Sequence, residues 1–185
     1  MKNPPMKINN AVKYAIGIIV VFLIRLIPFR IPNIEPMMAT IMPFAKKFKA
    51  LSGFVFGFFS IIVYDIFTSG IGVWTWVTAV MYGLVGVFAS LYLEKKKSKA
   101  RYYIGYSMVA TLVYDAVTGV GIGMLFFHQT FMVTFLGQIP FTALHLAGNI
   151  VFAGLLSPLI YKWVIENKNL ETAAVYSKVK NAFSA

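Results

Sequence analysis

The stretch Leu93-Glu94-Lys95-Lys96-Lys97-Ser98-Lys99-Ala100-Arg101 sets five basic residues between two long apolar runs. Fifteen of the seventeen Lys and Arg residues fall in four zones of this kind, always between or outside apolar segments. Basic loops of membrane proteins stay on the cytoplasmic side. Placing all four zones there predicts six membrane crossings, with both termini cytoplasmic. The other three zones hold Lys2, Lys7 and Lys13; Lys46, Lys47 and Lys49; and Lys162, Lys168, Lys178 and Lys180.

The composition predicts an integral membrane protein. Hydrophobic residues make up 59% of the chain and charged residues only 12%, whereas a soluble domain carries about 25% charged residues. We therefore expect an all-α, six-helix transmembrane bundle over residues 1–165, in the cell membrane, followed by a cytoplasmic tail over residues 166–185. The net charge of +11 is attributed to the inside-positive bias and to anionic lipid headgroups, so no nucleic-acid partner is expected.

Apolar runs, bounded by prolines, glycines and charged residues, give the expected segments. Residues 11–29 are long enough to cross ~30 Å of hydrocarbon. Residues 32–45 contain three prolines, so we expect a short or partly extended second crossing, which must be covered by neighbouring helices. Residues 119–137 are expected to form an outer loop or an interfacial piece. The remaining helices are expected over residues 51–68, 73–93 and 102–117, and from a start between 132 and 141 to about 164.

Asp65 and Asp115 are the most informative polar residues, because a carboxylate inside a membrane helix is costly unless paired or hydrated. Both belong to a weak repeat, in which Val-Tyr-Asp is followed by Thr three residues later. One interpretation is a polar pocket open to the outside. The other is structural, with each Asp paired to Arg25 or Arg30, and both can hold together.

Two further segments carry candidate binding residues. Asn33 and Glu35 lie in a proline-rich loop that would hold their side chains in place, although an ordinary solvated turn is the alternative. In the last apolar segment a polar stripe occupies one helical face. Gln138 and His145 are interpreted as pocket residues, and Asn149 as an interhelical hydrogen-bonding residue. The stripe consists of Gln138, Thr142, His145 and Asn149.

The motifs of common enzymes are missing from the sequence. It has no phosphate-binding loop, no zinc-protease helix motif and no serine nucleophile elbow. The absence of cysteine excludes disulfides and Cys-bound metals, and His128 is far from His145 in sequence. We therefore expect no enzymatic activity, no cofactor and no metal.

The expected topology, the short second segment and the polar outer ends resemble the S component of energy-coupling factor (ECF) transporters, over about residues 8–165. In that family the first helix carries an Ala-x-x-x-Ala motif, matched here by Ala11 and Ala15. The run Arg-x-Pro-Asn-x-x-Pro at residues 30–36 is similar to the family's first outer loop. The resemblance implies that Ala11 and Ala15 pack on a transmembrane coupling subunit.

The resemblance also implies a function. An S component binds a vitamin or related micronutrient from outside, docks on the coupling subunit with its two ATPase subunits, and topples to release the ligand inside. The charge balance of the outer half favours a neutral or cationic ligand, such as a heteroaromatic vitamin, and Trp74 and the pair Phe126-Phe127 could stack on its ring. Carried over by position, the binding residues are Asn33, Glu35, Trp74, Thr75, Asp115, Gln138 and His145, with Asp65 as a second-line candidate.

Two alternatives remain open at this stage. A small membrane scaffold of the cell-shape (MreD-like) type has a similar topology, and predicts that the polar stripes are internal packing. A stand-alone proton-coupled carrier would use Asp65 and Asp115 as proton sites and would need no ATPase partner. The face with Ala11 and Ala15 is the discriminating sequence feature, because docking on a coupling subunit needs it and a lone carrier does not.

Overall fold

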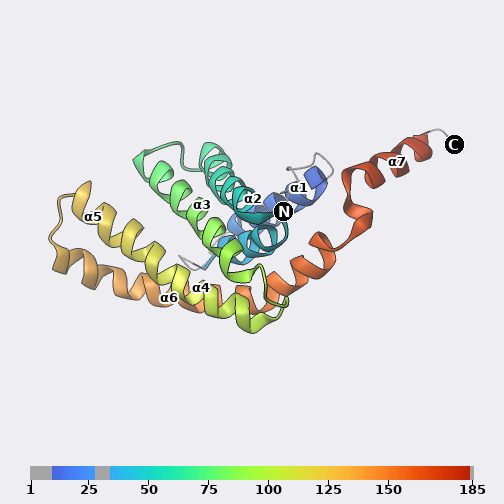
Figure 1. Ribbon diagram of the computed structural model, residues 1–185. Coiled ribbons are helices and arrows are strands. Elements are labelled where there is room, and N and C mark those ends of the chain that lie inside the picture. Colours follow the sequence, from blue (N-terminus) through green and yellow to red (C-terminus); the bar gives the residue numbers. More distant parts are fainter. Residues whose placement is uncertain (1–9, 28–33, 184–185) are drawn as a thin grey trace.

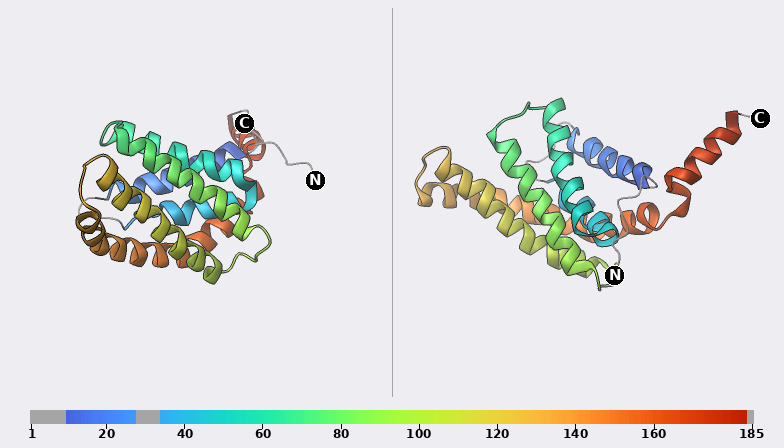
Figure 2. Two further views of the ribbon diagram at one scale, coloured as in Figure 1. Left: turned by 60° about the vertical axis from the view of Figure 1, so that its left-hand side comes forward. Right: turned by 45° about the horizontal axis from the view of Figure 1, so that its top comes forward.

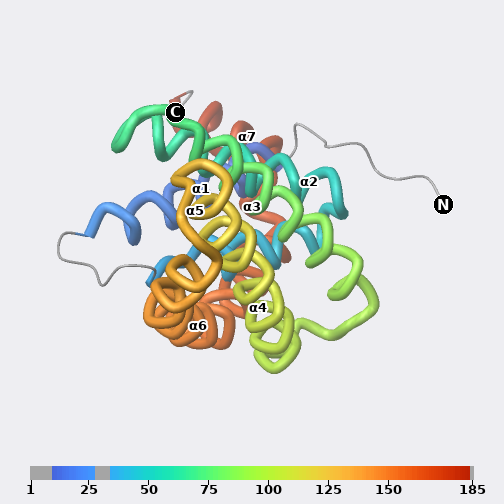
Figure 3. The backbone as a smooth tube through the Cα atoms, turned by 90° about the vertical axis from the view of Figure 1, so that its left-hand side faces the viewer, coloured from blue at the N-terminus to red at the C-terminus, as the bar shows by residue number. Residues whose placement is uncertain are grey.

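The computed structural model describes residues 10–27 and 34–183, and all regular secondary structure within them is helical (Figure 1). The long helices are α1 (Ala11–Arg25), α2 (Met37–Phe67), α3 (Val73–Leu93), α4 (Ala100–Asp115) and α6 (Phe131–Ile160). Helices α4 and α6 lie side by side as a hairpin (Figure 3), and α3 packs along α2. Asn33 and Arg30, which were singled out in the sequence, lie outside the described residues.

Helix α2 is divided by a sharp turn at Lys49, where φ is 74° and ψ is −176°. The rings of Phe44 and Phe56 stack with centroids 4.5 Å apart, although twelve residues of straight helix would separate them by about 18 Å. The two arms, residues 37–48 and 50–67, therefore fold back on each other. Of the two expectations for the second segment, short or partly extended, the structure has the short one, because residues 37–48 are helical. That neighbours cover it is confirmed, because residues 37–45 are all buried.

Four helical stretches are long and apolar enough to cross a membrane, so the chain is a multi-pass membrane protein. The turn at Lys49 divides the first of them, and the apolar run of α1 continues into residues outside the description. Six crossings and two cytoplasmic termini therefore stay predictions. The stretches are Met37–Phe67, Val73–Leu93, Ala100–Leu125 and Phe131–Ile165.

Glycines allow α2 and α3 to approach at backbone distance. A Cβ atom built on Gly86 would lie 2.2 Å from the carbonyl oxygen of Gly53, and one on Gly57 would lie 2.4 Å from that of Tyr82. Small residues at such positions are typical of close helix pairs in membranes.

The expected loop after the fifth apolar segment is largely helical. A π-helix over Ala116–Gly121 and the short α5 (Ile122–Leu125) continue α4, and α6 begins at Phe131, one residue before the expected range. The glycines that suggested a loop instead allow close packing on α6. A Cβ on Gly119 would lie 2.1 Å from Gln138 Oε1, and one on Gly123 would lie 2.4 Å from Thr134.

The C-terminal part leaves the bundle. After a π-helix over Tyr161–Ile165 and a 3-10 turn over Lys168–Leu170, α7 (Thr172–Phe183) extends away from the other long helices (Figure 2). The buried Lys13 Nζ donates a 2.8 Å hydrogen bond to the Ile165 carbonyl. This bond ties α1 to the end of the last long helix. Whether the chain divides into a domain and a tail at residue 165 stays a prediction.

Candidate functional site

A cavity of about 510 Å³ lies where the end of α1, the start of α3 and the middle of the α4–α6 hairpin meet, and we call it the polar–aromatic cavity. Its volume is within the range of small-molecule sites, about 300–1,000 Å³. Segments far apart in sequence therefore converge on one site. Six of the eight residues predicted for ligand binding line it: Glu35, Asp65, Trp74, Asp115, Gln138 and His145.

Thr75, the seventh predicted residue, lies behind the cavity wall. Its fully buried hydroxyl donates a 2.6 Å hydrogen bond to Asp65 Oδ2 and accepts a 3.1 Å bond from the backbone N–H of Gly72. This arrangement fixes the Asp65 carboxylate near the N-terminus of α3, where the helix dipole favours a negative charge. Thr75 is thus placed to position Asp65.

Arg25 and Glu35 form a mostly buried ion pair in the cavity wall. Arg25 Nε lies 3.3 Å from Glu35 Oε2, and each side chain is 13% exposed. The Tyr82 hydroxyl donates a hydrogen bond to Glu35, and the Arg25 guanidinium lies 3.7 Å from the centre of the Tyr64 ring. Such partners offset the desolvation of a buried pair. The expectation that Arg25 pairs with an aspartate is wrong, because it pairs with Glu35.

Asp115 and His145 form a second buried pair, which joins α4 to α6. Asp115 Oδ1 and His145 Nδ1 are 2.8 Å apart, and both side chains are nearly inaccessible to solvent. The Tyr114 ring packs edge-on against the imidazole at 5.7 Å. A carboxylate on Nδ1 orients the ring and leaves Nε2 for another partner.

Besides Arg25 Nε, which takes part in the ion pair with Glu35, three buried polar atoms of cavity residues have no hydrogen-bond partner among the described residues: Arg25 Nη1, Asp115 Oδ2 and His145 Nε2. Leaving such an atom unsatisfied costs about 1–3 kcal/mol. These three atoms are a hydrogen-bond donor, an acceptor and an imidazole nitrogen, and each is left for a molecule bound in the cavity.

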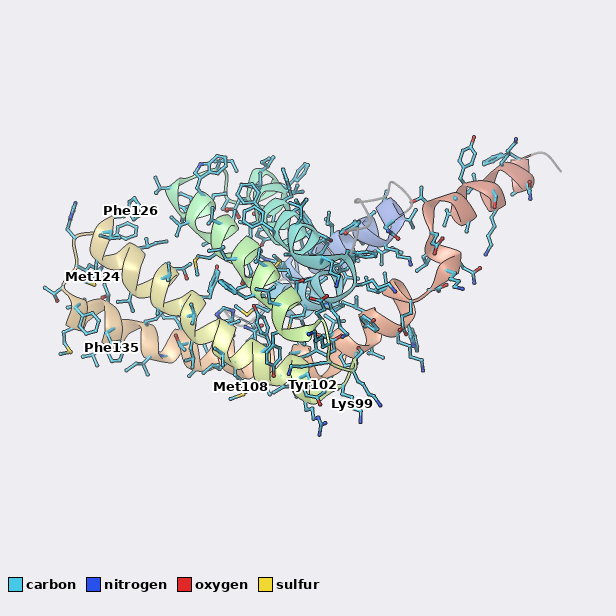
Figure 4. The ribbon with its side chains drawn as sticks, viewed as in Figure 1. Lys99, Tyr102, Met108, Met124, Phe126 and Phe135 are labelled. Carbon is cyan, nitrogen blue, oxygen red and sulfur yellow. The ribbon has the colours of Figure 1, made fainter. Side chains whose placement is uncertain are left out.

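Aromatic rings supply much of the remaining wall. Tyr82 and Tyr114 pack with centroids 4.5 Å apart, and the other rings in the lining are those of Tyr64, Trp74 and Phe141. Flat π-surfaces of this kind favour a planar ligand. Phe126 and Phe127, which were expected to stack on the ligand, do not line the cavity. They lie exposed at the tip of the hairpin, where Figure 4 labels Phe126 beside Met124.

The sequence interpretation missed Tyr64 and Tyr114 as cavity residues. Each directly precedes one of the repeated aspartates, so the repeated Tyr-Asp pair was the signal that could have found them. The repeated threonine differs in position between its two copies. Both threonines donate to the carbonyl of the preceding repeated tyrosine, but Thr118 lines the cavity whereas Thr68 is exposed.

Below the cavity, Asn149 serves packing, as expected. Its side-chain amide donates to Thr111 Oγ1 at 2.8 Å and approaches the sulfur of Met38 at 3.5 Å. These contacts join α6 to α4 and α2. Within residues 10–27 and 34–183, no group of three or more His, Asp or Glu side chains could hold a metal ion.

These features define a multi-pass α-helical membrane protein whose helices enclose a polar, aromatic cavity of small-molecule size. Residues 6–104, just over half of the 185-residue chain, match the family described as "ECF-type riboflavin transporter, S component". The chain belongs to this family, which confirms the resemblance to ECF transporter S components. No curated protein and no solved structure matches the chain.

The matched region covers one side of the cavity. It includes Glu35, Asp65 and Trp74, whereas Asp115 and His145 lie beyond it. Family membership therefore rests on residues that include only the first five of α4 and none of α6, so the cavity residues of that hairpin are independent information about the site.

Proposed function

We propose that this protein is the substrate-capturing subunit of an ECF-type importer and that it binds riboflavin, or a closely related flavin, in the polar–aromatic cavity. Binding takes place from the outer side, and a transmembrane coupling subunit with two ATPase subunits drives release inside. The observation that supports this most is the convergence of six predicted residues on one cavity that holds three unsatisfied polar atoms.

Riboflavin suits the chemistry of the wall. Its neutral, planar ring system carries an imide edge, with an N–H between two carbonyls, and a polyhydroxyl chain. Arg25 Nη1 can donate to a carbonyl, and Asp115 Oδ2 can accept from an N–H or hydroxyl. The tyrosines and Trp74 offer surfaces for the ring. The expectation of a neutral or cationic heteroaromatic ligand is compatible with this choice.

A docking face for the coupling subunit is available on α1. Ala11 and Ala15 are exposed, and Ile19 and Leu23 continue the same stripe at intervals of four residues. Lys13 points elsewhere, since it is buried against Ile165. Small side chains allow the backbone of another helix to approach, so this face supports the proposal that the coupling subunit packs here.

Ligand capture is tested by titrating the purified chain, without other subunits, into riboflavin and following flavin fluorescence. We expect saturable, one-to-one binding. Lumichrome, which has the ring without the chain, should compete, and ribitol, which has the chain without the ring, should not. Absence of saturable binding in the micromolar range would contradict riboflavin as the substrate.

Docking is tested separately, with Ala11→Trp combined with Ala15→Trp. We expect this variant to lose co-purification with the coupling subunit and to keep riboflavin binding, because both residues lie outside the cavity. The matched control is Val109→Trp with Val113→Trp, an exposed pair at the same spacing on α4. Equal assembly of both variants would refute the docking face.

A further inference from the structure

A second cavity, of about 480 Å³, lies near the other end of α3, and we call it the lysine cavity. Along α3 the lining of the polar–aromatic cavity reaches Tyr82, and the lysine cavity includes Lys96 just after the helix ends at Leu93, so the part of α3 between them separates the two linings by about 16 Å. Figure 4 labels Lys99 and Tyr102 at this end of α4, opposite Met124 and Phe126. The second cavity plays no part in the function proposed above.

The charges of the lysine cavity are strongly unbalanced. Its lining holds four ammonium groups and one carboxylate, that of Glu166. The nearby Glu94 does not correct this, because it forms an ion pair with Lys49. The hydrogen bond that Lys49 donates to Glu94, together with the attraction between their charges, lowers the pKa of the Glu94 carboxyl. The four lysines are Lys46, Lys96, Lys97 and Lys162.

Two of the ammonium groups are held in place by their surroundings. Lys46 Nζ donates a 2.7 Å hydrogen bond to the Leu93 carbonyl and another bond to the Lys96 carbonyl, so it joins α2 to the end of α3. Lys96 Nζ lies 4.3 Å from the centre of the Tyr92 ring and 5.3 Å from that of Tyr102. Positive charge is thus concentrated at a fixed place before any ligand arrives.

An apolar stripe on α6 leads to this cavity. Val151, Leu155 and Leu159 are exposed at intervals of four residues, and Lys162 follows three residues after the last of them. Trp163, 65% exposed, stands next to Lys162, and tryptophan is enriched at the depth of lipid headgroups. A membrane lipid has this same division, with acyl chains beside a charged phosphate.

We propose that the lysine cavity binds the phosphate group of an anionic lipid such as phosphatidylglycerol, whose acyl chain lies along the stripe of Val151, Leu155 and Leu159. Basic pockets between transmembrane helices recognise anionic headgroups through the same charge complementarity. The adjoining stripe lies on a helix apolar enough to cross the membrane, where acyl chains surround it. A lipid therefore matches both the stripe and the lysines, whereas a soluble acidic protein segment matches the lysines alone.

The test is mass spectrometry of the intact protein, released from detergent with equal amounts of phosphatidylglycerol and phosphatidylcholine. The native chain should retain phosphatidylglycerol selectively. The triple variant Lys96→Gln, Lys97→Gln, Lys162→Gln should reduce this retention at least tenfold, because each lysine near a phosphate contributes appreciably. Lys46 is left intact because it binds backbone carbonyls.

The control variant removes the same charge elsewhere, by Lys168→Gln, Lys178→Gln and Lys180→Gln in the C-terminal segment, and should retain the lipid as the native chain does. Gel filtration checks that both variants stay monodisperse. Equal lipid loss in both variants, or no preference for phosphatidylglycerol, would overturn the proposal. Displacement of the lipid by millimolar inorganic phosphate would also overturn it, because the site would then bind a free anion. Loss of coupling-subunit assembly with unchanged lipid retention would assign the cavity to a protein contact and likewise reject it.

Discussion

The two cavities are of nearly equal volume, about 510 and 480 Å³, yet their charges are arranged in opposite ways. In the polar–aromatic cavity, Arg25 faces Glu35, the His145 imidazole faces Asp115, and Asp65 accepts a hydrogen bond from Thr75. In the lysine cavity, four cations share the wall with a single carboxylate. Paired and buried charges stabilise a fixed site, whereas an unneutralised cluster attracts an anion from outside. The arrangement of charge, more than the size of the cavity, separates the two functions.

The comparison predicts that removing one charge matters most in the polar–aromatic cavity. Arg25→Met leaves the Glu35 carboxylate buried without its cation, so we expect the free energy of unfolding to fall by about 3–5 kcal/mol. Thermal unfolding in detergent measures this. The double variant Arg25→Met, Glu35→Gln should recover most of the loss, and a double variant as unstable as the single one would contradict the charge-pair explanation.

Asp115→Asn should mainly affect the ligand. A charge-assisted hydrogen bond is worth about 1.5–3 kcal/mol, so we expect riboflavin affinity to fall by roughly ten- to a hundredfold in a calorimetric titration. Asp65→Asn should have a smaller effect, because Asp65 Oδ2 already accepts a hydrogen bond from Thr75. Unaltered affinity of the Asp115 variant would make this residue structural.

A smaller effect is expected where the α4–α6 hairpin closes on the cavity. Gly119→Ala would place a Cβ 2.1 Å from Gln138 Oε1, so the glutamine side chain must move. Loss of one neutral hydrogen bond to the ligand corresponds to about 0.5–1.5 kcal/mol, or roughly two- to tenfold in affinity. Gly137→Ala is the matched control, since nothing lies within 4 Å of its built Cβ. Equal affinities in the two variants would remove Gln138 from the site.

The smallest effect on folding is expected in the lysine cavity. Lys97→Gln with Lys162→Gln should change the free energy of unfolding by no more than about 0.5 kcal/mol each, because both residues are exposed. Riboflavin affinity should stay as in the native chain. A large loss of either quantity would show that the two cavities are coupled, against the separation described here.

The pattern of charged residues in the sequence predicted the membrane class. It also predicted that lysines lie near one end of the helices and acidic residues near the other. It placed Asp65 and Asp115 at equal depth, and it separated them from the lysine clusters. The membrane class is confirmed, because burying a charge in hydrocarbon is so unfavourable that few places can hold one. The equal depth of the two aspartates in the membrane stays a prediction. The pairing of Arg25 with Glu35 could not be predicted, because it depends on how two helix ends meet in space.

Glycine was the least reliable signal. Gly53 and Gly86 allow α2 and α3 to approach at backbone distance. The same residue type at Gly119 and Gly123 suggested a loop, where the chain is helical and the glycines admit side chains of α6. Glycine is common both in loops and at close helix contacts, and only the residue that packs against it in the fold distinguishes the two. Likewise, the prolines of the second segment left open whether it is a short helix or partly extended, and the structure has a helix from Met37.

The central claim is that riboflavin occupies the polar–aromatic cavity and reaches it from outside. The chain has no cysteine, so single cysteines can be introduced at Thr118, which lines the cavity, and at Phe126, which lies exposed at the hairpin tip. A membrane-impermeant thiol reagent is then added to intact cells, with and without riboflavin. We predict that both cysteines react and that riboflavin protects only the one at position 118. Equal labelling of that cysteine with and without saturating riboflavin would contradict the account.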